Sequence, residues 1–412
     1  MVCVNFWTRN VCIIFVPNFN ENITCSNFNC NKFTQIIFSN YDNIDMSIKS
    51  HNNYISNYSN HYQQNKFNKT VNYNKIGLSH ITKIIFGYTF NKSVNDLPIK
   101  LENLIFGELF NRSVDKLSPN IIWLKFGKSF NHSVKKLPPN IKYIEFGSNF
   151  NQSINKLPLN LVYLTLGINY NLPIDEQNLN YLTQLTHLTF DCDFNNSVNN
   201  LPKTLTHLSF GTNFNQTIDN LPNNLCNLIL GDNFNHSVNS LPKKIKNIIF
   251  GYSFNKSIDS LSLHLTHLTL GTCFNQTVNH LPQNLTHLIF GSFFDQEITN
   301  LPSKLSNITF GYHFNKHIEM LPDNIETIIF GKCFNLELIN LPNGIKNVYF
   351  HIDSEFSHTL NCLPDTIEFL SIGEDYDLPI ENLPSKLKYV KCSSKYRYLK
   401  KLENKNFSIK TY

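Results

Sequence analysis

Ring side chains that recur at one position of a repeating sequence are the residues here best suited to bind another molecule. Trp123, Tyr143, Tyr163, His187 and His207 each stand directly before a leucine or isoleucine, with one interval of 24 residues and three of twenty. Because apolar residues alternate with them, short strands would present all five outward on one face, coil after coil. Contiguous exposed aromatic side chains are typical of binding hot spots. Stacking of neighbouring rings to cover the sheet is the other interpretation of this ring row.

Two members of the ring row are also histidines of a recurring Thr-His-Leu sequence, and imidazole commonly binds metals. His267 and His287 occupy the same position in later coils, so neighbouring imidazoles could share an ion. No third ligand stands in the same row, and solvated histidines are the preferred interpretation. The sequence therefore predicts no metal site.

The motifs of common enzymes do not occur in this chain. There is no G-x-G-x-x-G after a strand, no P-loop, no H-E-x-x-H and no G-x-S-x-G. Ten cysteines show no Cys-x-x-Cys pair, and Cys25 with Cys30 is the one weak candidate for metal binding. We expect free thiols in a reducing compartment, no catalytic residue and no cofactor.

A second row consists of asparagines, one at the same position of nearly every unit. Amide rows can bind carbohydrate or ions, but a buried amide can also satisfy the backbone donors and acceptors of a stacked turn. We predict this structural ladder, with inward side chains. Most of these residues begin an Asn-x-Ser/Thr sequence, and an inward side chain could not carry a glycan, which counts against secretion. The row is Asn91, Asn111, Asn131, Asn151, Asn171, Asn195, Asn215, Asn235, Asn255, Asn275, Asn315 and Asn335.

The elements that position these rows repeat every twenty residues. Each unit has the form L-P-x-x-[LI]-x-x-[LI]-x-[FL]-G-x-x-F-N-x-[ST]-[VI]-x-x, in which apolar residues alternate as in a short strand and Gly, Pro and Asn oppose helix. One strand cannot bury its own apolar side, so the units must stack. Stacking predicts a parallel sheet along one face of a solenoid and two buried phenylalanine columns. Gly167 to Asp191 and Phe350 to Ile372 depart from the spacing and predict bulged coils on the outer edge.

The F-G-x-x-F-N unit with Leu-Pro between units resembles the FNIP repeat, a relative of the leucine-rich repeats known from amoebae and their large DNA viruses. Residues 170–174 and 376–380 keep the Pro-Ile ending of that family. The resemblance implies an α/β-type solenoid that is mostly β, a right-handed leucine-rich-repeat-like array with its parallel sheet on the concave face and little helix. It also implies a role in protein interaction and no catalysis. Some relatives carry an F-box ahead of the repeats, and residues 1–62 contain no convincing one.

Three segments are expected. Residues 1–62 form an irregular N-terminal segment with a degenerate capping coil around Phe33–Ser39 and a loop from Asn40 to Gln64. Residues 63–392 form the solenoid of about 15 coils, each strand adding about 4.8 Å. Residues 393–412 form a basic tail or cap.

Charge and hydropathy limit the classes of partner. The net charge is +5, and residues 386–412 alone carry nine basic and one acidic residue, or +8, so the rest sums to −3. A nucleic-acid binder would show a basic stripe along its body, and no stretch approaches the roughly 18 apolar residues of a membrane helix. We expect a cytoplasmic, unsecreted protein, in the host cytoplasm if it is viral.

The favoured hypothesis is a non-enzymatic scaffold that holds an unidentified protein on the concave sheet, through the ring row. One alternative is a substrate-binding adaptor of a ubiquitin ligase, which residues 1–62 would have to recruit. The other is a carbohydrate-binding module that uses the ring row. The sequence leaves the partner and the oligomeric state open.

Overall fold

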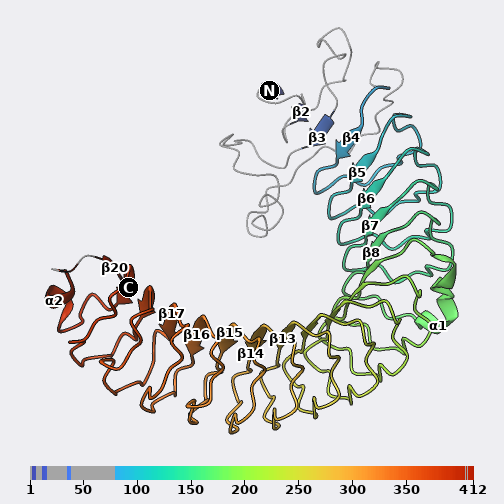
Figure 1. Ribbon diagram of the computed structural model, residues 1–412. Coiled ribbons are helices and arrows are strands. Elements are labelled where there is room, and N and C mark those ends of the chain that lie inside the picture. Colours follow the sequence, from blue (N-terminus) through green and yellow to red (C-terminus); the bar gives the residue numbers. More distant parts are fainter. Residues whose placement is uncertain (1, 6–11, 16–34, 39–78, 404, 406) are drawn as a thin grey trace. The chain divides into compact units, whose positions relative to one another are not determined.

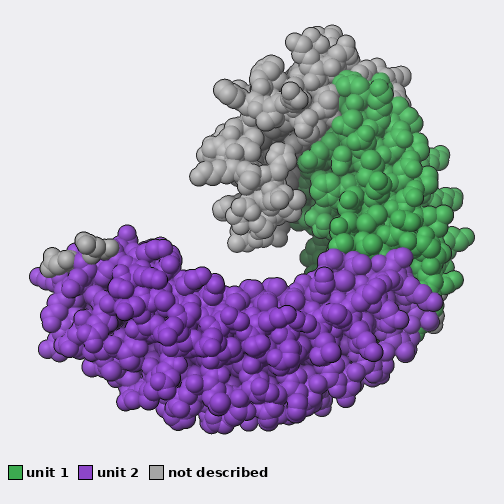
Figure 2. Space-filling view, in the orientation of Figure 1, with its two compact units in different colours: residues 1–196 green, residues 197–412 purple. Residues whose placement is uncertain are grey.

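The computed structural model describes residues 2–5, 12–15, 35–38, 79–403, 405 and 407–412. The chain divides into two compact units, residues 1–196 (unit 1) and residues 197–412 (unit 2), shown in Figure 2. The expected N-terminal loop and the Cys25–Cys30 pair lie outside the described residues.

The described residues of unit 1 form short strands and a brief helical stretch. Its elements are β1 (Val2–Asn5), β2 (Cys12–Phe15), β3 (Gln35–Phe38), β4 (Lys83–Ile85), β5 (Asn103–Ile105), β6 (Trp123–Lys125), β7 (Tyr143–Glu145), β8 (Tyr163–Thr165), α1 (Ile174–Gln177), the 3-10 helix η3 (Leu179–Tyr181) and β9 (His187–Thr189). Strands β1 and β2 pair antiparallel, and from β2 to β9 each strand pairs parallel with the next. Strand β3 falls within the expected degenerate coil.

Unit 2 continues the same pattern with parallel strands throughout its described residues. Its elements are β10 (His207–Ser209), β11 (Asn227–Ile229), β12 (Asn247–Ile249), β13 (His267–Thr269), β14 (His287–Ile289), β15 (Asn307–Thr309), β16 (Thr327–Phe330), β17 (Asn347–Phe350), β18 (Phe369–Ser371), β19 (Tyr389–Cys392), α2 (Leu399–Glu403) and β20 (Ser408–Thr411). Within this unit the strands lie along the inner side of the arc formed by the coils (Figure 1). Strand β20 pairs with β19, so the basic final segment adds to the sheet.

The register follows the twenty-residue repeat. Asn247 pairs with His267 and His267 pairs with His287, so equivalent residues of successive units stand side by side. In β12, β13 and β14 the middle side chain is buried and its two neighbours face outward, as period-2 alternation requires. The predicted parallel solenoid with little helix is confirmed.

Two columns of phenylalanine fill the interior. Phe106 and Phe110 stack within one coil with ring centroids 3.8 Å apart, and Phe110 stacks on Phe130 of the next coil at 6.1 Å. Phe254 repeats the arrangement in unit 2, and all four rings are no more than 3% exposed. Burying one such ring stabilises the fold by roughly 1.5–3 kcal/mol, so the two columns contribute substantially to the core beside the buried aliphatic residues of each coil.

The recurring glycine marks the closest approach of adjacent coils. A Cβ added to Gly331 would lie 1.9 Å from the carbonyl oxygen of Gly311. The slot therefore needs glycine because backbones meet there. Where the spacing is irregular, Asp191 and His351 occupy the same slot.

The 24-residue interval of unit 1 is occupied by α1 and η3, which lie on the side of the coils away from the strands (Figure 1). Gln177 of α1 is buried, and its Oε1 accepts hydrogen bonds from Ser153 Oγ at 2.8 Å and the Ile154 N–H at 3.1 Å. Such contacts tie the irregular coil to the coil before it.

Candidate functional site

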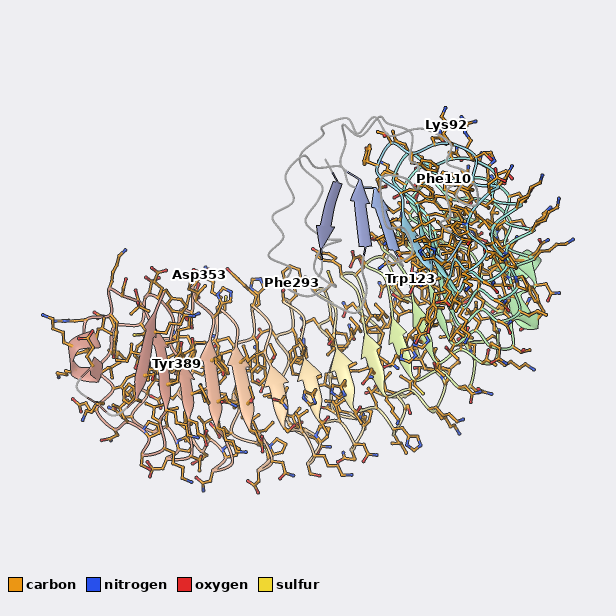
Figure 3. The ribbon with its side chains drawn as sticks, turned by 90° about the horizontal axis from the view of Figure 1, so that it is seen from above. Lys92, Phe110, Trp123, Phe293, Asp353 and Tyr389 are labelled. Atoms are coloured by element: carbon orange, nitrogen blue, oxygen red, sulfur yellow. The ribbon has the colours of Figure 1, made fainter. Side chains whose placement is uncertain are left out.

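The ring row lies at the first residue of consecutive strands on the sheet face of unit 1. Trp123, Tyr143 and Tyr163 begin β6, β7 and β8 and are 37%, 41% and 37% exposed, and Trp123 is labelled in Figure 3. His187 begins β9 and is half-buried. These four side chains are brought together, whereas His207 begins β10 of unit 2 and is described with that unit.

Three rings of this row stack on one another. The Tyr143 and Tyr163 centroids are 4.9 Å apart at an interplanar angle of 20°, and those of Tyr163 and His187 are 4.0 Å apart at 24°. These three rings therefore turn their faces toward each other along the row. The same side chains are therefore both stacked and partly exposed to solvent, so the stacking interpretation and the binding interpretation of the row are compatible.

Charged and polar residues lie beside the row, at the third strand position. Lys125 and Glu145 form an ion pair at 2.5 Å across β6 and β7, and Thr165 follows on β8. An exposed pair of this kind contributes little to stability. It supplies a polar border to the rings.

In unit 2 the first strand residues form a hydrogen-bonded polar row. The Asn227 amide Nδ2 donates to His207 Nε2 at 2.7 Å, and Asn247 Nδ2 donates to Asn227 Oδ1. Since His207 Nε2 accepts, its proton is on Nδ1, which donates to Thr206 Oγ1 at 2.9 Å. Burial lowers the pKa of His207. The imidazole is thus held neutral, as a structural member of the row.

The recurring histidines do not assemble a set of three metal ligands in the described part of the chain. His267 and His287 stack at 4.2 Å, and no group of three His, Cys, Asp or Glu residues among the described residues could hold a metal ion. The described cysteines, such as Cys273 and Cys333, are free thiols. An open groove of about 400 Å³ in unit 1 is lined by residues that include Asn120 and Asn140, whose amides donate to backbone carbonyls of the preceding coil.

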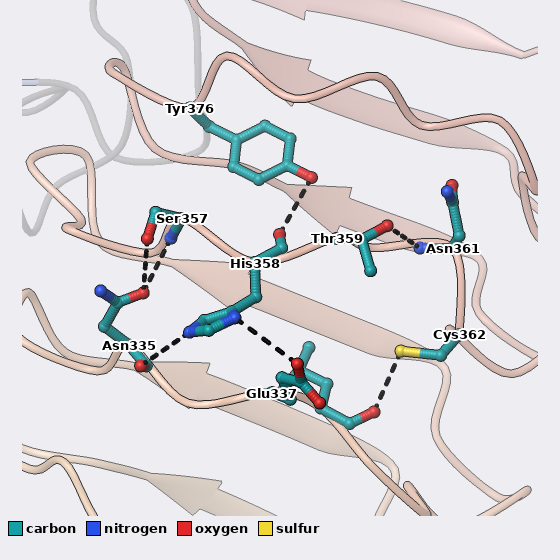
Figure 4. Close-up of polar contacts among 9 residues, drawn as sticks. Asn335, Glu337, Ser357, His358, Thr359, Asn361, Cys362 and Tyr376 are labelled. Carbon is teal, nitrogen blue, oxygen red and sulfur yellow. Dashed lines mark hydrogen bonds and ion pairs between the residues drawn. The ribbon is translucent and has the colours of Figure 1, made fainter.

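The asparagine ladder joins successive coils, but not from the interior. The Oδ1 of Asn215 accepts from the Asn235 backbone N–H at 3.1 Å, and Asn235 Oδ1 accepts from Asn255 N–H at 3.0 Å. The same contact recurs along both units, within 2.9–3.2 Å, for Asn91, Asn111, Asn131, Asn151, Asn171, Asn255 and Asn275. Figure 4 shows one end, where Asn335 Oδ1 accepts from the Ser357 N–H at 2.9 Å and the Ser357 hydroxyl at 3.0 Å.

The predicted inward position of these amides is wrong. Asn235 is half-buried and Asn131 is exposed, because the phenylalanine before each asparagine points into the core and alternation turns the next side chain outward. Only the amide oxygen is used in the ladder, which explains how Asp295 takes the same place: Asn315 N–H donates to Asp295 Oδ1 at 3.0 Å. Because these side chains do not point inward, the argument that they could not carry a glycan no longer holds.

Sequence reasoning missed one set of surface residues. Ile229, Ile249, Ile289 and Ile329 stand at the third strand position of unit 2 and are 42%, 43%, 42% and 37% exposed. The alternation that predicted the ring row also predicts this row, because the residues on either side of a buried central residue share one face.

Comparison with known proteins agrees with the repeat pattern. The model of the FNIP repeat family matches residues 130–169, 214–253, 234–273, 254–293, 274–313 and 314–353. No curated protein matches the chain significantly. No helix among the described residues is long and apolar enough to cross a membrane.

Several solved structures are similar. CroV588, described as a novel circular LRR protein, is 31% identical with a TM-score of 0.71, over 96% of this chain and 65% of that one. This chain therefore spans 65% of the length of CroV588. YopM from Yersinia enterocolitica WA-314 is 18% identical with a TM-score of 0.42, over 76% of this chain and 78% of YopM. The functional domain of InlJ from Listeria monocytogenes is 14% identical with a TM-score of 0.46, over 72% and 69%.

Proposed function

Since this chain contains FNIP repeats and folds as a leucine-rich-repeat-like solenoid, we propose that it is a non-enzymatic scaffold that binds a protein partner through the ring row of unit 1. The supporting observation is that Trp123, Tyr143 and Tyr163 leave more than a third of their surface in solvent. Equivalent positions hold asparagine, as in Asn103 and Asn247. The fold accepts a small amide there, so the rings have another purpose.

The geometry of the rings suits protein recognition. Tryptophan and tyrosine are enriched among residues that dominate binding energy, and they have few rotatable bonds to immobilise. Stacking of Tyr143 on Tyr163, and of Tyr163 on His187, already restrains those bonds before a partner arrives. Less conformational entropy is then lost on binding.

The same stacking argues against Tyr163 as a platform for carbohydrate, the ligand class of the other alternative. A sugar packs its apolar face on the open face of an aromatic ring, and Tyr163 has one neighbour on each side at 4.9 Å and 4.0 Å. Ring edges and hydroxyl groups remain, which suit peptide groups and apolar side chains. The ubiquitin-ligase alternative depends on residues 1–62, most of which lie outside the described part of the chain.

The test is the triple variant Trp123→Asn, Tyr143→Asn and Tyr163→Asn. The wild-type chain is used to capture proteins from an extract of the cells in which it occurs, and mass spectrometry identifies them. The most abundant captured protein is then purified, and its affinity for the wild type and the variant is measured by calorimetry. We expect the triple variant to weaken binding by at least about 2 kcal/mol, the scale of a hot spot. Its free energy of unfolding should fall by about 1–3 kcal/mol, since two ring stacks worth about 0.5–1.5 kcal/mol each are lost.

A matched control replaces three exposed apolar residues of unit 1 that lie off the sheet face: Leu109→Asn, Leu159→Asn and Ile168→Asn. This control should keep full affinity. The proposal fails if the control loses as much affinity as the triple variant, or if the triple variant binds as tightly as the wild type.

A further inference from the structure

The sheet face of unit 2 has an unusual composition that the ring row does not explain. The first and third residues of β10 to β17 face outward, and none of these sixteen residues is Asp, Glu, Lys or Arg. In unit 1 the corresponding positions include Lys83, Lys125 and Glu145, and Lys391 follows on β19. We call the outward residues of β10 to β17 the neutral face.

One half of the neutral face is an apolar stripe. Ile229, Ile249, Ile289 and Ile329 are each 37–43% exposed, and half-buried Thr269 and Thr309 stand between them. Isolated exposed apolar side chains are ordinary, but here Ile229 and Ile249 lie in adjacent coils, and only a threonine, which also carries a methyl group, separates each of the following isoleucines. A strip of this kind on a rigid sheet favours association.

The other half is polar, and several of its side chains already pair with one another. Besides the Asn247–Asn227–His207 chain, Asn307 Nδ2 contacts His287 Nε2 at 3.1 Å, and Asn347 Nδ2 donates to Thr327 Oγ1 at 3.0 Å. A polar group can be covered at little cost when its hydrogen bonds are internal. A partner can therefore bury this row without pairing each amide and imidazole.

The spacing of the stripe favours a helix as the occupant. Adjacent coils are about 4.8 Å apart, and the apolar ridge of an amphipathic helix advances about 5.3 Å per contact, from 3.5 residues at 1.5 Å each. Residues on one side of an extended strand recur about every 6.6 Å, so the side chains of a bound strand would no longer match the coil spacing after two coils. Ile229 and Ile329 are five coils apart, or about 24 Å, which a helix of about 16 residues spans.

The lack of charge on the neutral face and the short helices of this chain limit further which molecule can bind there. A charged residue on the contacting ridge would be desolvated with no counter-ion on the neutral face, which is strongly unfavourable. A second copy of this chain offers no such helix in its described residues, where α1 and α2 have four and five residues.

We propose that the neutral face of unit 2 is a second docking surface, distinct from the unit 1 rings Trp123, Tyr143 and Tyr163, for an amphipathic helix of another protein whose contacting ridge is apolar and uncharged. The apolar stripe receives the ridge, and the polar row borders it. The aromatic residues Tyr252 and Phe293, 52% and 45% exposed just beyond the ends of β12 and β14, lie at the margin where the flank of the helix would pass. Phe293 is labelled in Figure 3.

The experiment is a selection from two displayed peptide libraries against the full chain. One library holds 21-residue helices randomised at the ridge positions, and the other holds β-hairpins randomised on one face. We expect the helix library to be enriched, with aliphatic residues and no charge on the ridge. Affinities of the selected helices are then measured for the wild type and for Ile249→Thr with Ile289→Thr, a change that the row already accommodates at Thr269.

The threonine variant should bind the selected helices about tenfold more weakly, equivalent to about 1.4 kcal/mol. The control Ile339→Thr with Ile352→Thr changes residues of unit 2 that are 45% and 40% exposed off the sheet, and should bind within twofold of the wild type. The proposal would be overturned if hairpins were enriched, if no helix were enriched, or if the enriched helices carried charged ridges. It would also be overturned if the selected helices bound the threonine variant as tightly as the wild type. Dimerisation of the wild type that the threonine variant abolishes would also overturn it, by assigning the face to a second copy.

Discussion

The substitution Gly331→Ala tests whether contact between backbones explains the recurring glycine. The added Cβ would lie 1.9 Å from Gly311 O and 2.9 Å from the Cα of Tyr312, whereas real Cβ atoms stay at least 3.0 Å from such atoms. The two coils must therefore separate by about 1.1 Å at this point, from 3.0 minus 1.9. Both obstructing groups are backbone and cannot rotate away.

The expected loss follows from the contacts that this separation stretches. Cys333 N–H donates to Tyr312 O at 2.9 Å and Phe310 N–H donates to Ile329 O at 2.8 Å. Lengthening by about 1.1 Å takes both beyond normal hydrogen-bond range, and each contributes about 1 kcal/mol. Looser stacking of Phe310 on Phe330, now at 5.8 Å, adds about 0.5–1.5 kcal/mol. The variant should lose about 2–4 kcal/mol of local stability.

Hydrogen exchange read by mass spectrometry is the appropriate assay, because a stacked array can open over a few coils while the rest stays folded. Amides of residues 307–334 should exchange about 30-fold to several hundredfold faster, since each 1.4 kcal/mol is a factor of ten. The matched control is His351→Ala, at the same slot of the next coil, where a side chain is already present. Equal protection in Gly331→Ala and the wild type would refute the steric explanation, and so would equal losses in the two variants.

Three further changes have directions set by the structure. Tyr170→Phe should stabilise unit 1 by about 1 kcal/mol in a denaturant titration, because the fully buried Tyr170 hydroxyl has no hydrogen-bond partner and stands in a phenylalanine column; a loss of stability would contradict this. Asn235→Ala should lose about 1 kcal/mol and Asn235→Asp less than about 0.5 kcal/mol, because the aspartate keeps the acceptor; equal losses would show that the amide donor matters. Burial lowers the folded-state pKa of His207 and His287 below 6.5, so the unfolded chain binds more protons and stability should fall as pH drops through and below about 6.5. His287→Asn should make urea midpoints at pH 7.5 and 5.5 more alike, and an unchanged difference between them would show that His287 does not contribute.

The regular coils were predictable because each position of the repeat has one dominant physical requirement. Phe106 and Phe110 needed only the alternation of apolar residues and the stacking argument. The glycine spacing indicated a constrained backbone, but the sequence did not distinguish an unusual torsion from the contact seen at Gly331. That distinction depends on the distance between coils, which no single unit encodes.

Two surface features show where the sequence pattern was insufficient. The Asn235 amide was expected inside because the turn of a stacked coil leaves backbone groups that a buried amide could satisfy, whereas the amide oxygen acts at the surface between neighbouring coils. The exposure of Ile249 was not predicted, although this residue stands between the buried Ile248 and Phe250. In both cases the position relative to the buried neighbouring residue is the better guide to exposure.

The alternation within each three-residue strand also has an evolutionary consequence. The central residue, the phenylalanines and the glycine maintain the coil, while the outer two residues take part in neither the phenylalanine columns nor the asparagine ladder. Mutations at those two positions can accumulate with little effect on folding, and duplication of a whole unit would extend the surface without disturbing the register. Recognition can thus drift rapidly while the architecture stays under selection, so related chains should differ most along the same two rows that here carry rings and isoleucines.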